Sequence, residues 1–191
     1  MNLVEFVPTC YSDVVHIARN MRELDAEEIL PLIWGGTPEN LAAVVIAAGG
    51  LATVALSGGV PVAAYGATQT RPKCWSVWMF ATDQWPKVAL SVTRRLKTEV
   101  IETIYEVGAV RADCWSMEGH HVAHRWLEML GAKYEATLED YGPTRKNFHC
   151  YSWTLSRLEK KNVYRPICPK GSILPGSSPP TGATRAATGQ R

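Results

Sequence analysis

The pattern of apolar and polar residues predicts alternating strands and helices over residues 1–157. The first predicted elements are, in order, a strand at 3–7 and helices at 13–21, 25–30 and 38–48. Asp25 is predicted to cap the second helix, and Thr37-Pro38 to start the third, because threonine caps helices and proline is favoured at their first position. The N-terminal quarter is therefore predicted to be mainly helical.

The middle of the chain predicts a hairpin and a crossover. Strands at 51–56 and 60–67 flank Ser57-Gly58-Gly59, a turn signal, and a third strand is predicted at 75–80. Pro86 is predicted to open the longest helix, which continues to Glu106 with apolar residues at helical spacing. The later predicted elements are a parallel strand at 110–115, a helix at 121–130 and a final hairpin of 134–138 with 148–155.

Composition divides the chain into a body, 1–159, and a tail, 160–191. The tail holds six basic residues and no acidic one, and it is rich in Pro, Gly, Ser and Thr. Such a segment buries too little apolar surface to offset its ordering entropy, so we expect an extended tail. It could lack a role, contact DNA weakly, or dock on a partner through Arg165, Ile167, Ile173 and Leu174.

Other classes of protein are disfavoured by composition. No apolar run reaches the about 18–20 residues that a membrane span needs, and the N-terminus lacks the features of a secretion signal. The five cysteines are widely spaced without a C-x-x-C pair, which favours buried free thiols in a reducing compartment over a zinc site.

Histidines and tryptophans supply the remaining candidate chemistry. His120 and His124 are four residues apart and could face one way, as an acid–base or metal pair, although partly exposed helix residues would show the same spacing. Trp75 and Trp78 have odd spacing, so they are expected on opposite faces of a strand. No metal site and no catalytic residue is predicted.

The element order and the segment 111–132 resemble the GNAT N-acetyltransferases. In that segment a strand and a turn lead into a helix that ends on Leu130-Gly131-Ala132. The resemblance implies an α/β (α+β) fold with a mixed, mostly antiparallel central sheet flanked by helices. In the family, a glycine-containing loop before the long helix binds the pyrophosphate of CoA. Here that stretch contains Gln84, Trp85 and Pro86 but no glycine.

The sequence supports two alternative hypotheses about cofactor binding. The missing glycines predict that the chain takes no cofactor, because proline removes one N–H donor and Trp85 would crowd the phosphates. The alternative is an active acyl-CoA-dependent N-acetyltransferase. In that case the resemblance implies that acetyl-CoA would contact Phe80, Ala81, Thr82, Gln84, His121, Ala123 and Trp126.

The body also resembles GNAT-like internal virion or head proteins of short-tailed bacteriophages. The matching segments are 13–22 with 25–28, 75–82 and 122–132. This resemblance implies a non-catalytic structural component of the virion, made in the host cytoplasm and present in a multi-copy assembly. The implied partners are other virion proteins, among them portal, adaptor or internal core proteins. A host-takeover protein that binds a bacterial enzyme is a further alternative.

Overall fold

The computed structural model describes residues 3–160, which form a layered structure around one seven-stranded sheet. The strand order is β1-β2-β3-β4-β5-β7-β6. The strands are β1 (Val4–Pro8), β2 (Leu51–Ser57), β3 (Val60–Arg71), β4 (Cys74–Ala81), β5 (Arg111–Met117), β6 (Lys133–Leu138) and β7 (Phe148–Thr154). Neighbouring strands are antiparallel except β4 and β5. The predicted mixed, mostly antiparallel sheet is therefore confirmed.

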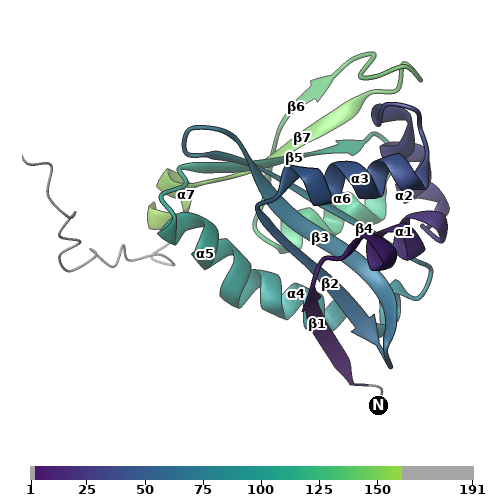
Figure 1. Ribbon diagram of the computed structural model, residues 1–191. Helices are drawn as coiled ribbons and strands as arrows, with labels where there is room; N and C mark the ends of the chain where they lie inside the picture. The colour runs from purple at the N-terminus through teal and green to yellow at the C-terminus, as the bar shows by residue number, and fades with distance from the viewer. Residues whose placement is uncertain (1–2, 161–191) are drawn as a thin grey trace, which may run out of the picture.

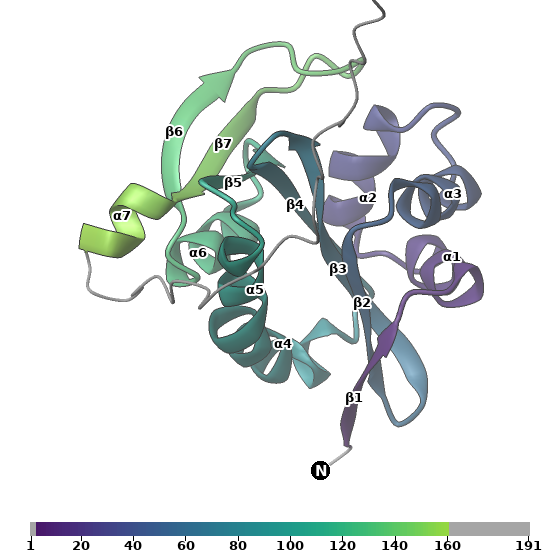
Figure 2. The ribbon, with the colours of Figure 1, turned by 60° about the vertical axis from the view of Figure 1, so that its left-hand side comes forward.

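Helices cover both faces of the sheet. They are α1 (Tyr11–Arg19), α2 (Glu23–Ile29), α3 (Pro38–Ala48), α4 (Ala89–Arg95), α5 (Ile101–Glu106), α6 (His121–Met129) and α7 (Leu155–Lys160). Figure 1 shows that strands β5, β7 and β6 slant away from strands β1 to β4. In Figure 2, α1, α2 and α3 lie on one side of the sheet and α4, α5 and α6 on the other.

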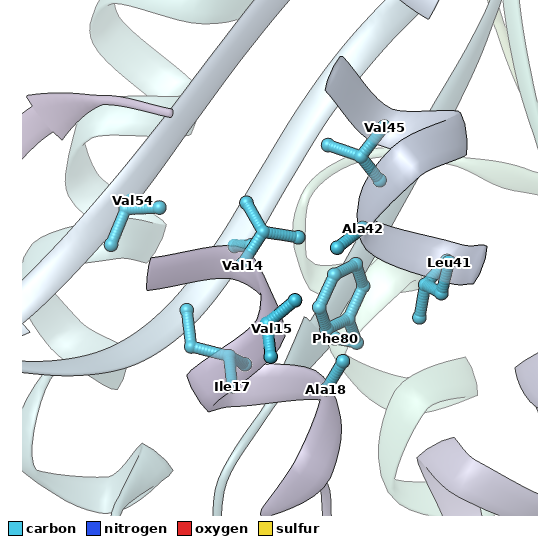
Figure 3. Packing of buried hydrophobic residues seen from close by; sticks show 10 residues of the cluster. Val14, Val15, Ile17, Ala18, Leu41, Ala42, Val45, Val54 and Phe80 are labelled. Atoms are coloured by element: carbon cyan, nitrogen blue, oxygen red, sulfur yellow. The ribbon is translucent and has the colours of Figure 1, made fainter. Parts of the chain in front are cut away.

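The core on the α1–α3 face explains why the N-terminal helices form. Val14, Ile17 and Ala18 fall on one side of α1 and are buried against α3 and the sheet. Phe80 of β4 lies among them (Figure 3) and is 1% exposed. Burying one such large side chain stabilises the fold by about 1.5–3 kcal/mol, so this face anchors the N-terminal helices to β4.

The long helix predicted from Pro86 to Glu106 is interrupted. A 3₁₀ turn, Trp85–Lys87, precedes α4, and a π-helical turn, Leu96–Val100, separates α4 from α5. Pro86 cannot donate a main-chain hydrogen bond, and regular α-helix begins only at Ala89. π-Helical turns are rare and are frequent at functional sites.

Three local predictions need correction. Asp25 does not cap α2, because the N-cap position is Arg22, whose side chain makes no capping hydrogen bond. Asp25 lies inside the helix and is buried. Cys10 is exposed, whereas Cys114 and Cys150 are buried free thiols as predicted. Helix α7 was not predicted.

The tail lies outside the described residues, and with it the predicted partner-binding residues Arg165, Ile167, Ile173 and Leu174. Among residues 3–160, no helix combines the length and apolar character that crossing a membrane requires.

Candidate functional site

Strands β4 and β5 separate part of the way along their length. They pair in parallel only over Cys74–Ser76 and Arg111–Asp113. Beyond these residues each strand continues without the other, and a cavity of about 180 Å³ lies at the gap. An opening between two strands leaves main-chain groups without a strand partner, and these groups can bind a ligand or a side chain.

The cavity is lined mainly by apolar side chains from both faces of the sheet. Trp78 packs against the cluster on the α1–α3 face, whereas Met79 packs against the cluster around α4. The π-helical turn between α4 and α5 also lines the cavity, through its first and last residues, Leu96 and Val100. The cavity therefore passes through the plane of the sheet at the gap.

A partly buried carboxylate of α2, Glu28, lines the cavity. Oε2 of Glu28 accepts hydrogen bonds from Ser116 Oγ at 3.0 Å and from the main-chain N–H of Met117 at 2.9 Å. It also lies 2.8 Å from Nδ1 of His120, whose side chain is 5% exposed. Glu28 lines the cavity, and among residues 3–160 no hydrogen-bond partner is seen for its Oε1.

Asp25, one turn before Glu28 on α2, meets the other strand of the gap. It accepts a hydrogen bond from the N–H of Ala81 at 2.9 Å and a bidentate pair of hydrogen bonds from Arg22. Nε2 of His120 lies 3.7 Å from Asp25 Oδ1. The two carboxylates of α2 thus bind one main-chain N–H on each of the two separated strands.

Burial sets the protonation of groups around this gap. Burial raises the pKa of Asp25 above its usual value, and the charge of Arg22 opposes that rise. Burial also raises the pKa of the Cys114 thiol strongly, and the nearby charge of Glu28 adds to the effect. Cys114 therefore stays a neutral thiol and is not an activated nucleophile.

Only two of the seven residues expected to contact acetyl-CoA line the cavity. These are Ala123 and Trp126 of α6. Phe80 is buried in the core between the sheet and helices α1 and α3. The N–H of Ala81 donates to Asp25. Thr82 is buried at the end of β4. Gln84 and His121 are exposed, and neither lines the cavity.

The histidines separate instead of facing one way. His120 belongs to the cavity, whereas His124 stacks on His149 at 4.9 Å and lies 5.3 Å from the ring of Tyr151. Within the described part of the chain, no group of three His, Cys, Asp or Glu side chains is arranged to hold a metal ion.

The loop between β4 and α4 uses its own main-chain donors. The N–H groups of five residues in 82–88 donate to protein acceptors, and Pro86 has none. The five donors are Thr82 to Val62 O, Gln84 to Thr82 Oγ1, Trp85 to Thr82 O, Lys87 to Gln84 O and Val88 to Trp85 O. A pyrophosphate needs free N–H groups here, so the loop does not fit that part of a CoA molecule.

Sequence reasoning missed Glu28, and it misassigned Asp25 as a cap. The available signal was their spacing of three residues, which places both carboxylates on one side of a helix. Their partners come from β4, β5 and the start of α6, about 55 to 90 residues later in the chain.

Comparison with solved structures shows the fold. yncA of Salmonella typhimurium, described as an acetyltransferase and solved with its cofactor acetyl-CoA, is 14% identical with a TM-score of 0.59, over 81% of this chain and 95% of its own. A GNAT-family acetyltransferase of Bacillus anthracis is 9% identical with a TM-score of 0.61, and the match covers 79% of this chain and 94% of that protein. The ribosomal-protein-S18-alanine N-acetyltransferase of Escherichia coli is 15% identical with a TM-score of 0.59, over 81% and 94%.

No protein-family model matches the sequence, and no curated protein matches it. At these identities the structural matches establish a GNAT-like fold, as predicted. They also overturn the prediction that the chain takes no cofactor, because a protein with this fold holds acetyl-CoA. That prediction relied on the missing loop glycines alone and did not consider the cavity between β4 and β5. The fold of the described residues is that of the GNAT acetyltransferases.

Proposed function

We propose that this chain is an acyl-CoA-dependent N-acyltransferase whose acyl donor lies in the gap between β4 and β5. The observation that carries the proposal is the apolar cavity at this gap, whose lining includes the hydrogen-bonded Glu28–His120 pair. Acetyltransferases with the same fold favour this function over the non-catalytic role. The virion role, its partners and its location stay predictions from the resemblance to phage proteins.

The cavity suits the narrow end of the donor. Its volume of about 180 Å³ is below the roughly 300–1,000 Å³ of a pocket that encloses a whole small-molecule ligand. Ala123 and Trp126 of α6 and Met79 of β4 line it. Bound acetyl-CoA would supply an activated thioester there, held by its acyl-pantetheine arm between these side chains.

Glu28 is the proposed general base. Three donors fix Oε2, which leaves Oε1 as the oxygen that accepts a proton from an attacking amine. His120 holds the carboxylate in place through Nδ1. As the amine forms a C–N bond with the thioester carbonyl carbon, the C–S bond would break. Glu28 would accept the amine proton, and the leaving thiolate would take up a proton from solvent.

A main-chain N–H of β4 is placed to polarise the thioester carbonyl. The N–H and C=O of Ala81 bond to Asp25 and to Arg22 N, so both point away from β3. Main-chain directions repeat every second residue along a strand, and the N–H of Met79 therefore points into the same gap. A donor placed where negative charge develops lowers the barrier to acyl transfer.

A thermal-shift titration with acetyl-CoA tests this function. A ligand at 100 times its Kd adds about 2.7 kcal/mol to the free energy of unfolding, which raises the Tm of a chain of this size by about 5–10 °C. Ala123→Trp places an indole in the cavity and is expected to remove the shift. Glu128→Trp, an exposed position on the same helix, is the matched control and should keep it.

A wild-type protein without any shift at millimolar acetyl-CoA would contradict the proposed function. An equal shift in wild type and Ala123→Trp would place the ligand elsewhere. Circular dichroism of both tryptophan variants establishes that each is folded before its titration is interpreted.

A further inference from the structure

The two ends of the proposed donor site differ in what they offer a ligand. The gap between β4 and β5 presents an apolar cavity and the free Oε1 of Glu28. In the loop 82–88, where a pyrophosphate would lie, five N–H groups already donate to protein acceptors. Glycines that would let the main chain approach phosphates are missing from it.

Side chains close this end further. The indole of Trp85 meets that of Trp126 edge to face at 5.6 Å, and the guanidinium of Arg22 lies 5.7 Å from the Trp85 ring. Nε1 of Trp126 donates to Thr93 Oγ1 at 2.9 Å, which ties α6 to α4. Trp85, a residue of the loop, thus packs beside the cavity that Trp126 also lines.

The charges of the loop do not form a phosphate site either. Asp83 is exposed, and its carboxylate would repel a diphosphate. The ammonium of Lys87 is bound to Oε1 of Gln84 at 3.1 Å. What remains for a phosphate is the first turn of α4, a helix of seven residues.

We infer that the site recognises its donor by the acyl-pantetheine arm, and that the diphosphate and nucleotide of CoA add little to binding. The donor class is then acyl-pantetheine thioesters, whether the arm is part of CoA or is attached to a carrier protein. This inference rests on the proposed function, because it assumes that the cavity holds the acyl-pantetheine arm.

The test compares three ligands by calorimetric titration of the full chain: acetyl-CoA, S-acetyl-pantetheine and ADP. We expect the two thioesters to bind with Kd values within about threefold of each other and ADP not to bind at 100 times that concentration. A loop that made two charge-assisted hydrogen bonds to phosphate would instead favour acetyl-CoA by more than about 100-fold. Such a preference, or binding of ADP, would overturn the inference and leave the proposed function standing.

If neither thioester binds, the proposed function fails, and the inference fails with it. Salt gives a second readout, since contacts to phosphate weaken as ions screen them. The Kd of acetyl-CoA should change less than about twofold between 50 and 500 mM NaCl. A tenfold weakening would count against recognition by the arm.

A third donor distinguishes the two sources of the arm. Acetyl-pantetheine attached to an acyl carrier protein is compared with acetyl-CoA in the rate of thioester consumption. A higher rate from the carrier protein identifies it as the source, and a lower rate identifies CoA. Both results support recognition by the arm, provided that the two small thioesters bind equally.

Discussion

The gap between β4 and β5 and the loop after β4 satisfy their main-chain N–H groups in opposite ways. In the gap, Ala81 and Met117 donate to carboxylates that α2 brings from elsewhere in the chain. In the loop, four N–H groups donate to neighbouring atoms of the same segment, and that of Thr82 donates to Val62 of β3. The first arrangement leaves one oxygen of Glu28 without a hydrogen bond among residues 3–160, and the second occupies five of the loop's N–H groups. The two ends of the proposed donor site therefore differ in the groups that they offer a ligand.

The largest expected effect is on catalysis at the gap. Glu28→Gln keeps an acceptor for Met117 N–H but removes the base, and general-base catalysis contributes typically about 10²–10⁴-fold. We expect kcat for thiol release from acetyl-CoA, with a panel of primary amines as acceptors, to fall by that factor while the Kd stays unchanged.

Glu27→Gln is the matched control for this prediction. Glu27 lies on the same helix, is exposed and pairs with Lys146. Its variant should keep wild-type kcat. Equal rates in wild type and Glu28→Gln would remove Glu28 from the mechanism.

The next largest effect is on stability. Asp25→Ala leaves Arg22 and the N–H of Ala81 without their shared partner, and breaking a buried ion pair from one side costs about 3 kcal/mol or more. Urea unfolding should show this loss in the free energy of unfolding. Asp25→Asn retains an acceptor for Ala81 and should lose less; an equal loss would show that the Ala81 hydrogen bond contributes nothing.

A smaller effect concerns pH. Burial lowers the pKa of His124 below its usual 6.5, and the neighbouring His149 lowers it further. The unfolded chain therefore binds this proton more readily than the folded chain does. The contribution of His124 to stability is complete above pH 6.5 and is lost as the pH falls, by at most about 1.4 kcal/mol per pH unit.

The measurement is urea unfolding at pH 7.0 and pH 5.0 for wild type and His124→Asn. The wild type should lose more free energy of unfolding than the variant over this range. Identical losses would assign the pH dependence to other groups.

The smallest effect is expected in the loop. Lys87 is exposed and bound to Gln84, so Lys87→Ala should change the Kd of acetyl-CoA less than about threefold and leave kcat unchanged. The same titration measures it. A tenfold weaker Kd would show that the loop contacts phosphate, and the contrast between the two ends of the site would then be wrong.

Local signals predicted the elements better than the site. Helix α3 begins at Pro38 behind the Thr37 cap and ends before Gly49, as the sequence indicated, because each signal acts within a few residues. Trp75 and Trp78 pack in clusters on opposite faces, as the two-residue period of a strand required. The interruption of the long helix was not predicted.

The site depended on contacts that no local pattern contains. Glu28 and His120 are 92 residues apart in the chain, and only the packing of α2 across the gap brings them together. Asp25 matched the rule for a helix cap, but its partner is a strand residue 56 positions later. The missing loop glycines were visible in the sequence, whereas the cavity beside them depends on where β4 and β5 stop pairing.

Tryptophan fluorescence during titration with acetyl-CoA tests the central claim most directly, because Trp78, Trp85 and Trp126 line the cavity. The account predicts a saturable change in emission for the wild type and for Glu28→Gln, since the base is not needed for binding. It predicts no saturable change for Ala123→Trp. A wild type without a saturable change, or the same change in Ala123→Trp, would contradict an acyl-donor site between β4 and β5.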